Sequence, residues 1–409
     1  MKIQKILIFA IAKRKTEGNF KMKSFMVKFE YMLKHNVFIN KIFRLITSFF
    51  FRIIGIFIPM DNTAILFSAL NKKYNDSPKA IYEYIISRPE FKDFKYYWAV
   101  DDKFAGDVLG NVTIIKPDSF KYFLTALKCK YWIASVNIER SLKIKRKNTV
   151  YLHTWHGIPI KAIGNEAVGR KDFDFSYVDY FCVSSHYDIV TYKKSFNVDE
   201  KQTLKVGMPR NDTLYRTTDE EIIDIKNRLG LPLDKKILLY APTWRDSTNS
   251  GKSYQIKPPV DLEYWEKELG KDYILLLRTH PYTNELLGVT FGDFVRDYIN
   301  YPDVNDLLKI SDVLISDYSG TIFDYSILER PIISFAYDLE EYSKERGFAL
   351  NMREDLPCRI AKTESEVIDW IKNIDFDYEK EVTKKIKRKF LEFGGNATEE
   401  CVKTMFKLK

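Results

Sequence analysis

From residue 62 onward, short apolar runs alternate with longer stretches in which apolar residues recur every three or four positions. The short runs predict β-strands and the longer stretches predict helices, an alternation typical of βαβ units with parallel sheets. Two series are visible. The first has strands expected at residues 64–67, 96–100, 112–115, 131–134, 150–152 and 180–183, with helices near 78–87 and 119–128. The second has strands expected at 236–240, 273–277, 313–316 and 331–335, with helices near 219–229, 262–269, 304–310 and 321–328.

A Gly-Met-Pro-Arg turn at residues 207–210 joins the two series. The 409 residues exceed the size at which one hydrophobic core keeps growing, so two domains of ordinary size are expected. We therefore predict an α/β protein with two Rossmann-like domains, residues 61–206 and 207–376, that face each other across a cleft. Residues 377–409 have helical charge spacing, which predicts helices that pack back on the first domain.

Residues 1–60 are basic, with only Glu17 and Glu30 as acidic residues, in a chain whose net charge is +9. Within residues 37–60, apolar positions are interrupted every three or four residues by a stripe of polar or small ones, Lys41, Arg44, Ser48, Arg52 and Gly55. This pattern predicts an amphipathic helix in a membrane interface, with its cations at anionic head groups. Three cations in one span, at roughly 2.5–3.5 kcal/mol each near the bilayer centre, count against a transmembrane helix. The alternative is a helix whose apolar face packs on the protein's own core.

Composition excludes several other classes. The four cysteines lie far apart and form no CxxC pair or Cys/His metal spacing, so they indicate neither a disulfide framework nor a structural zinc site, and a reducing cytoplasm fits best. The triplet Asp172-Phe173-Asp174 lies in a charge-rich stretch, and we predict neither a metal nor another cofactor. The basic excess is joined to a long apolar helix face and no nucleic-acid motif occurs, so nucleic acid is not a predicted partner.

Two predicted strands end in unusual polar corners. Residues 150–152 lead into His153, Thr154, Trp155 and His156, and residues 273–277 lead into Arg278, Thr279 and His280. In open α/β sheets the ligand crevice lies beyond the carboxyl ends of the strands. A single histidine at such a place is more often a hydrogen-bonded structural residue. Two such corners in two halves of the chain favour a functional site.

A third corner follows the strand expected at 313–316. Ser319, Gly320 and Thr321 stand between this strand and the next helix, where free backbone N–H groups favour a phosphate. The alternative is an ordinary Ser/Thr helix cap.

Six motifs, none specific alone, occur in a distinctive order and spacing. They are TWHGIP at 154–159, GMPRND at 207–212, YAPTWR at 240–245, RTHP at 278–281, SDYS at 316–319, and PII with YD between 331 and 338. Over residues 149–342 the chain resembles the CDP-glycerol glycerophosphotransferase family of teichoic acid synthesis. It departs from the family at Gly320, where a second Ser is frequent, and at Ile158, where Thr is frequent.

The resemblance implies a GT-B-like fold with an acceptor domain followed by a CDP-polyol donor domain. It implies transfer of glycerol phosphate, or a related polyol phosphate, from CDP-glycerol or CDP-ribitol to a hydroxyl of a polyprenyl-diphosphate-linked saccharide, with release of CMP. Such a phosphotransferase (enzyme class 2.7.8) serves teichoic acid or related cell-surface polymer synthesis, peripherally at the cytoplasmic face of the cell membrane. The short length favours a primase-like enzyme.

The resemblance also implies roles for residues in the motifs. His156 is the predicted general base, because an imidazole of near-neutral pKa can take the proton of the attacking hydroxyl. His280, the second predicted catalytic residue, and Arg278 would face the diphosphate of the donor. The other predicted substrate-binding residues are Trp155, Gly157, Arg210, Thr243, Arg245, Asp317, Ser319, Gly320 and Thr321.

Two other functions fit the same sequence. A GT-B glycosyltransferase that uses a nucleotide sugar would also use paired histidines and a Ser/Thr-rich helix start. A non-catalytic membrane-associated binding protein would have the basic N-terminal helix as its main feature.

Overall fold

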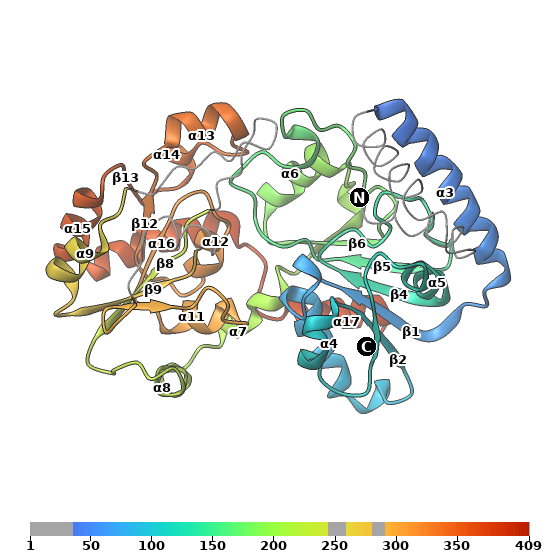
Figure 1. The fold of residues 1–409 in the computed structure, drawn as a ribbon, viewed down its shortest axis with the longest axis horizontal. Coiled ribbons are helices and arrows are strands. Elements are labelled where there is room, and N and C mark those ends of the chain that lie inside the picture. Colours follow the sequence, from blue (N-terminus) through green and yellow to red (C-terminus); the bar gives the residue numbers. More distant parts are fainter. Residues whose placement is uncertain (1–35, 244–258, 280–290, 409) are drawn as a thin grey trace, which may run out of the picture. The chain divides into compact units, whose positions relative to one another are not determined.

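The computed structural model describes residues 36–243, 259–279 and 291–408. It contains two parallel β-sheets, so the predicted α/β class with parallel sheets is confirmed (Figure 1). The chain divides into two compact units. The first unit comprises Met1–His156, Tyr177–Phe181 and Thr398–Lys409, and the second comprises Gly157–Ser176 and Cys182–Ala397. This division differs from the predicted join at residue 207, and the cleft between the domains stays a prediction.

The first sheet has the strand order β3-β2-β1-β4-β5-β6-β7. Its strands are β1 (Asp61–Ser68), β2 (Lys95–Ala99), β3 (Thr113–Ile115), β4 (Cys129–Ala134), β5 (Val150–His153), β6 (Tyr180–Val183) and β7 (Thr203–Lys205). The chain runs from β1 through β2 to β3 on one side and then returns with β4 on the other side of β1. The strand order therefore reverses between β1 and β4, which is the topological switch point of this sheet.

Helices surround this sheet, among them α4 (Asp76–Ile86) and α5 (Phe120–Lys128), with short 3₁₀ turns at Leu70–Lys72, Pro89–Phe91 and Asp102–Asp107. An aromatic cluster packs between α4 and the sheet. The rings of Phe67 and Trp98 lie 5.0 Å apart, and those of Tyr82 and Trp98 lie 5.6 Å apart. Helix α5 begins at a Ser119 cap, whose hydroxyl accepts the Tyr122 N–H at 3.0 Å.

The second sheet has the order β10-β9-β8-β11-β12-β13. Its strands are β8 (Lys236–Tyr240), β9 (Tyr273–Leu277), β10 (Val295–Asp297), β11 (Val313–Ser316), β12 (Ile332–Phe335) and β13 (Arg359–Ala361). Its central strands are buried on both faces, which is why they read as continuous apolar runs. The helices of this unit are α6 (His186–Phe196), α7 (Asp212–Tyr215), α8 (Asp219–Arg228), α9 (Leu262–Leu269), α11 (Val304–Ile310), α12 (Thr321–Ser326), α13 (Leu339–Arg346), α14 (Met352–Asp355), α15 (Glu364–Lys372) and α16 (Phe376–Phe390).

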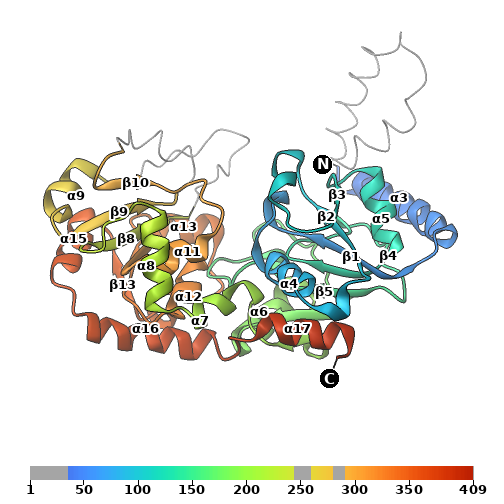
Figure 2. The same ribbon diagram turned by 90° about the horizontal axis from the view of Figure 1, so that it is seen from below.

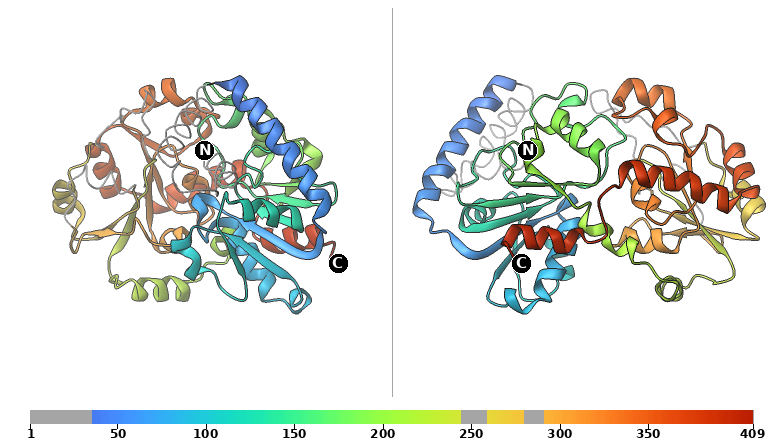
Figure 3. Two further views of the ribbon diagram at one scale, coloured as in Figure 1. Left: turned by 45° about the vertical axis from the view of Figure 1, so that its right-hand side comes forward. Right: turned by 180° about the vertical axis from the view of Figure 1, so that it is seen from behind.

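Helix α3 (Val37–Phe57) packs on the first unit beside α5 (Figures 1 and 3). The side that meets the unit carries small and polar residues around Phe51, whose ring lies 5.0 Å from that of Phe123. A Cβ at Gly55 would lie 3.2 Å from a methyl of Leu127. The packing therefore uses the stripe of small and polar positions rather than the broad apolar face.

The polar stripe of α3 also bonds to the loop after β4. The Lys143 N–H donates to the Ser48 hydroxyl at 3.1 Å, and the Arg52 Nε donates to the Lys143 carbonyl at 2.6 Å. Arg52 therefore contacts the protein's own loop, and the contact of the stripe's cations with anionic head groups stays a prediction.

The opposite side of α3 is apolar and exposed. Nine large apolar side chains on it are between 41% and 80% exposed: Phe38, Ile42, Leu45, Ile46, Phe49, Phe50, Ile53, Ile56 and Phe57. Helix α3 therefore packs on the protein's own core, as the alternative expected, but through its stripe of small and polar residues rather than its broad apolar face. Its place in a membrane interface stays a prediction. None of the helices described is long and apolar enough to cross a membrane.

The two C-terminal helices belong to different units. Helix α16 packs in the second unit, where the Phe390 ring lies 4.7 Å from that of Phe323. Helix α17 (Ala397–Phe406) packs in the first unit, where the Phe406 ring lies 4.8 Å from that of Phe91 and 4.5 Å from that of Tyr131 (Figure 2). The apolar face of α16 contributes to the second core and also contacts α6, where the Tyr187 ring lies 5.1 Å from that of Phe390. Because α6 lies within the predicted first domain, residues 61–206, the packing of residues 377–409 on that domain stays a prediction.

Candidate functional site

The first corner lies where β5 ends. After His153, the Thr154 N–H donates to the Ala134 carbonyl at 2.8 Å, which extends the pairing with β4 by one residue. Trp155 then adopts a left-handed backbone with φ of 55°, and its N–H donates to His153 Nδ1 at 3.1 Å. A bulky residue in this conformation is strained by about 1–3 kcal/mol, and such strain concentrates at functional sites.

The backbone turn at Trp155 sets the position of His156. The Nδ1 atom of His156 lies 3.0 Å from the Ser135 carbonyl oxygen, just past the end of β4. Because a carbonyl only accepts hydrogen bonds, Nδ1 carries the proton and Nε2 of the neutral ring keeps its lone pair. The ring of Trp155 lies 4.0 Å from the imidazole. The arrangement presents a half-buried imidazole whose Nε2 can accept a proton in the neutral form of the ring.

His153, the other histidine of this corner, is a structural residue. It is fully buried and stacks on Phe181 with ring centroids 4.8 Å apart. Burial, with a smaller contribution from His156, holds the pKa of His153 well below its usual range, so its imidazole is neutral.

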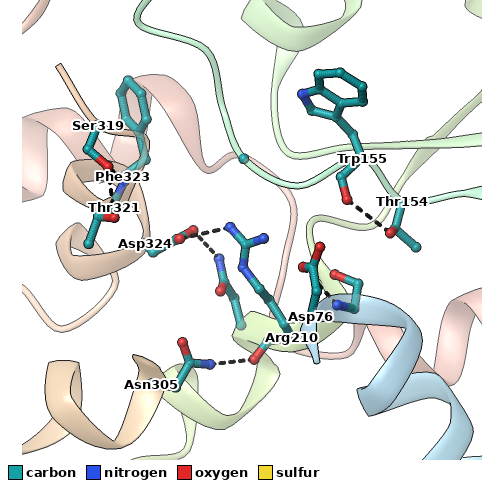
Figure 4. A network of polar contacts seen from close by, with 12 residues as sticks. Asp76, Thr154, Trp155, Arg210, Asn305, Ser319, Thr321, Phe323 and Asp324 are labelled. Atoms are coloured by element: carbon teal, nitrogen blue, oxygen red, sulfur yellow. Dashed lines mark hydrogen bonds and ion pairs between the residues drawn. The ribbon is translucent and has the colours of Figure 1, made fainter. Parts of the chain in front are cut away.

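In the second unit, the corner after β11 is organised by Asp317. This buried carboxylate accepts the Thr243 N–H at 2.7 Å and the Tyr318 N–H at 2.6 Å. It thereby ties the end of β8 to the end of β11. Beyond it, the Ser319 hydroxyl lies 3.0 Å from the Thr321 hydroxyl at the start of α12 (Figure 4).

Gly320 allows a close approach between this corner and the chain that follows His156. A Cβ at Gly320 would lie 2.8 Å from the Ile158 carbonyl oxygen, closer than real Cβ atoms come. The segment after Gly157 is further held in the second unit, because the Tyr187 hydroxyl donates to the Pro159 carbonyl at 2.7 Å. Both departures from the family pattern, at Gly320 and Ile158, therefore lie at one contact.

Arg210 is part of a polar network close to Gly157, where an added Cβ would lie 3.8 Å from Arg210 Nη2. Its Nη2 lies 2.8 Å from Asp324 Oδ2, and the side chains of the two residues are only 14% and 7% exposed (Figure 4). The Asn211 amide donates to the other Asp324 oxygen at 2.6 Å, and the Asn305 amide donates to the Arg210 carbonyl at 2.6 Å. The sequence patterns did not single out Asp324. The signal that could have found it is an acidic residue among the apolar residues at the start of a predicted helix.

Arg278 follows β9 and holds a loop. Its Nη1 donates to the carbonyls of Tyr298 at 3.0 Å and Tyr301 at 2.9 Å, and burial lowers the pKa of its guanidinium. The predicted residues His280 and Arg245 lie outside the described residues.

The D-x-D triplet is engaged in local contacts. Asp172 bonds to Arg170 at 3.2 Å, and Asp174 accepts the Ser176 N–H at 3.1 Å. Within the described part of the chain, no three His, Cys, Asp or Glu side chains gather as metal ligands would.

Comparison with known proteins gives a consistent set of relatives. Residues 49–407 match the family model of CDP-glycerol:poly(glycerophosphate) glycerophosphotransferase. A teichoic acid glycerol-phosphate transferase of Staphylococcus aureus is 36% identical over 340 residues, which cover 78% of this chain and 85% of that protein. A teichoic acid poly(glycerol phosphate) polymerase of Staphylococcus epidermidis is 36% identical over 323 residues, covering 74% of this chain but only 44% of the relative. The chain therefore spans less than half the length of that polymerase.

Among solved structures, that of the wall teichoic acid polymerase TagF is similar, with a TM-score of 0.74 and 32% identity. The likeness covers 85% of this chain and 89% of that one. A variant of the same polymerase was also solved after soaking with CDPG.

Proposed function

Because the chain belongs to the CDP-glycerol:poly(glycerophosphate) glycerophosphotransferase family, we propose that it transfers glycerol phosphate from CDP-glycerol to a hydroxyl of a polyprenyl-diphosphate-linked saccharide, releasing CMP. The product would be teichoic acid or a related cell-surface polymer. The observation that carries the proposal is the hydrogen bond from His156 Nδ1 to the Ser135 carbonyl. It leaves Nε2 with the lone pair that a general base needs.

In the proposed step, the acceptor hydroxyl attacks the phosphorus that bears the glycerol. A bond forms between this phosphorus and the acceptor oxygen, and the bond from the same phosphorus to the bridging oxygen of CMP breaks. CMP leaves with that oxygen, and the hydroxyl proton passes to His156 Nε2. Catalysis then rests on positioning and on stabilising charge at the phosphoryl oxygens.

The donor would bind to the second unit. The hydroxyls of Ser319 and Thr321 lie together at the start of α12 and would contact phosphate oxygens. Asp317 has a positioning role in this proposal, because it fixes the Thr243 backbone that leads to Arg245. Arg210 already has a carboxylate partner in Asp324, so it would support the Gly157 turn more than neutralise the donor.

The exposed apolar face of α3 would lie in the interface of an anionic membrane. Burying one large apolar side chain is worth about 1.5–3 kcal/mol, so several together suffice for peripheral attachment. The net charge of +9 favours anionic lipids over neutral ones. The proposed site of action is the cytoplasmic face of the cell membrane, where a lipid-linked acceptor would be available.

The transferase proposal is tested by CMP release from purified protein. CDP-glycerol, CDP-ribitol and a UDP-sugar are each offered with a polyprenyl-diphosphate disaccharide. We expect acceptor-dependent CMP release from CDP-glycerol, reduced ~100-fold or more in His156→Ala, since general-base catalysis contributes about 10²–10⁴-fold. His186→Ala is the matched control, because this histidine is 69% exposed on α6. Turnover of the UDP-sugar instead would identify a glycosyltransferase, and full activity of His156→Ala would exclude His156 as the base.

Membrane attachment is tested by sedimentation with vesicles of phosphatidylglycerol or of phosphatidylcholine. A triple variant, Leu45→Ser, Phe49→Ser and Ile56→Ser, should lose at least ~10-fold in affinity for the anionic vesicles. The control Ile223→Ser with Leu233→Ser changes exposed apolar residues elsewhere and should bind normally. Equal binding by the triple variant would contradict the proposed role of this face.

A further inference from the structure

A cluster of two cations and one carboxylate lies at the carboxyl edge of the first sheet. Lys72 comes from the loop after β1, Asp118 from the loop after β3, and Arg140 from the loop after β4. Lys72 Nζ bonds to one oxygen of Asp118, and Arg140 Nε donates to the other at 2.6 Å. The three side chains are 24%, 10% and 19% exposed, respectively, so the cluster is largely shielded but reachable.

The charges of this cluster do not balance. Burial alone would raise the pKa of Asp118, but Arg140 and Lys72 outweigh it and hold that pKa below its usual range. The carboxylate is therefore ionised, and it is shared by two cations. A largely buried group of charges with one excess positive charge is a favourable place for an anion.

The backbone supports the same conclusion. All three residues of the cluster adopt left-handed conformations, with φ of 57° at Lys72, 63° at Asp118 and 52° at Arg140. Such conformations are unfavourable for residues with side chains and persist where the surrounding structure demands them. Three separate loops are thus strained at the residues that meet here.

The cluster also flanks the switch point between β1 and β4, where ligands bind in open α/β sheets. Ser135 directly follows β4 at this point, and its N–H donates at 3.2 Å to the carbonyl of Ser68, the last residue of β1. The carbonyl of Ser135 accepts the His156 Nδ1 hydrogen bond. Its hydroxyl is fully buried and has no hydrogen-bond partner among the described residues. His156 and Arg140 are therefore both held by the segment that leaves β4.

We propose that Lys72 and Arg140 bind a phosphate group of the acceptor and thereby bring its hydroxyl to His156. This inference rests on the proposed transferase function and assigns the acceptor to the first unit. The phosphate can come from the diphosphate that joins the saccharide to its lipid or from a glycerol phosphate already attached to the saccharide. Both present the oxygen anion that an ammonium and a guanidinium recognise.

The path of the chain suits an acceptor that is anchored in lipid. Glu139, next to Arg140, accepts the N–H groups of Ile144 at 2.7 Å and Lys145 at 2.5 Å. Lys143, which lies between Arg140 and Ile144 in this loop, bonds to Ser48 and Arg52 of α3. One short segment thus connects the cation cluster to the helix whose apolar face would lie in the membrane.

The test uses three acceptors that carry the same disaccharide. The first has a short polyprenyl diphosphate, the second is a neutral alkyl glycoside, and the third is that glycoside extended by one glycerol phosphate. In Lys72→Gln and Arg140→Gln we expect the KM of a phosphate-bearing acceptor to rise at least ~10-fold, as for a lost charge-assisted hydrogen bond. The KM of CDP-glycerol and the KM of the neutral glycoside should stay unchanged. The acceptor whose KM rises in these variants identifies the source of the phosphate.

The controls separate binding from folding. Lys116→Gln removes a cation at the same edge of the sheet, paired with Asp102 and 65% exposed, and should change nothing. Arg140→Lys keeps the charge and should restore most of the affinity, while urea unfolding checks that each variant is folded. An unchanged KM for both phosphate-bearing acceptors, or an equal rise for the neutral glycoside, would overturn the inference.

Calorimetric titration of the polyprenyl-diphosphate disaccharide, without donor, separates this inference from the proposed function. If the wild type releases no CMP yet binds this acceptor at least ~10-fold more tightly than Lys72→Gln, the transferase proposal fails and the phosphate site stands. If CMP release is normal and the two proteins bind the acceptor equally, the site fails and the function stands.

Discussion

Replacing Gly320 by Ala adds one methyl group at the contact between the corner after β11 and the segment that follows His156. The backbone of Gly320 has an ordinary right-handed conformation, so alanine can adopt it without strain. The added Cβ would nevertheless lie 2.8 Å from the Ile158 carbonyl oxygen, whereas ordinary contacts begin near 3.4 Å. The segment must therefore retreat by about 0.6 Å.

The cost follows from the packing around this segment. Ile158 is 2% exposed in the core of the second unit, and the Pro159 carbonyl is held by Tyr187, so little room exists for a retreat. Overpacking of this kind lowers the free energy of unfolding by about 1–3 kcal/mol. Because His156, the proposed general base, lies two residues before Ile158, turnover should fall by ~10-fold or more, as for a reacting group displaced by a fraction of an ångström.

Urea unfolding and CMP release measure the two effects. Gly292→Ala is the matched control in the same unit, because a Cβ there meets nothing within 4 Å and should leave both quantities within experimental error. Wild-type stability together with wild-type turnover in Gly320→Ala would refute the argument, since it would mean that the segment moves freely.

Three further predictions concern other sites. Asp324→Ala leaves the buried Arg210 guanidinium without its carboxylate. The free energy of unfolding, measured with urea, should fall by about 3 kcal/mol in this variant and by ~1 kcal/mol in Asp324→Asn. Equal losses in the two variants would contradict this. Burial raises the pKa of Glu139 to about 7, so between about pH 5 and 7 the folded chain holds a proton that the unfolded chain releases. Stability should fall as the pH rises through this window by up to ~1.4 kcal/mol per unit, and Glu139→Gln should flatten this dependence; an unchanged slope would show that Glu139 does not titrate there. Phe406→Ala removes the ring between Phe91 and Tyr131 and should destabilise the first unit by about 2 kcal/mol in thermal unfolding, with no change in the second.

The sequence predicted the interior strands of both sheets, and of the edge strands described it predicted β3 but missed β7, β10 and β13. Strands β8, β9 and β11 lie where the pattern put them, because burial on both faces requires an unbroken apolar run. The three strands that were missed, β7, β10 and β13, each have three residues and each lies at an edge of its sheet. Edge strands are short and partly exposed, so they carry little hydrophobic pattern.

The candidate site divides in the same way. The corner at His156 was predictable, since polar residues directly after an apolar strand mark its carboxyl end. The partnership of Arg210 with Asp324 was not, because 114 residues separate the two. Arg210 belongs to the GMPRND motif, but Asp324 sits in no distinctive local pattern. The same holds for Lys72, Asp118 and Arg140, whose common feature is a strained backbone that only the folded chain reveals.

The placement of α17 in the first unit affects the order in which the two units can finish folding during translation. Residues 398–408 complete the first unit, yet they are synthesised after the second unit. During translation, Phe91, Phe94 and Tyr131 are therefore made before Phe406, and their rings lack this packing partner until α17 has been synthesised. Domains usually fold from the N-terminus as they emerge, but here the earlier unit is finished later. A chain that stalls or is cut before residue 398 would leave this aromatic surface open to chaperones and proteases.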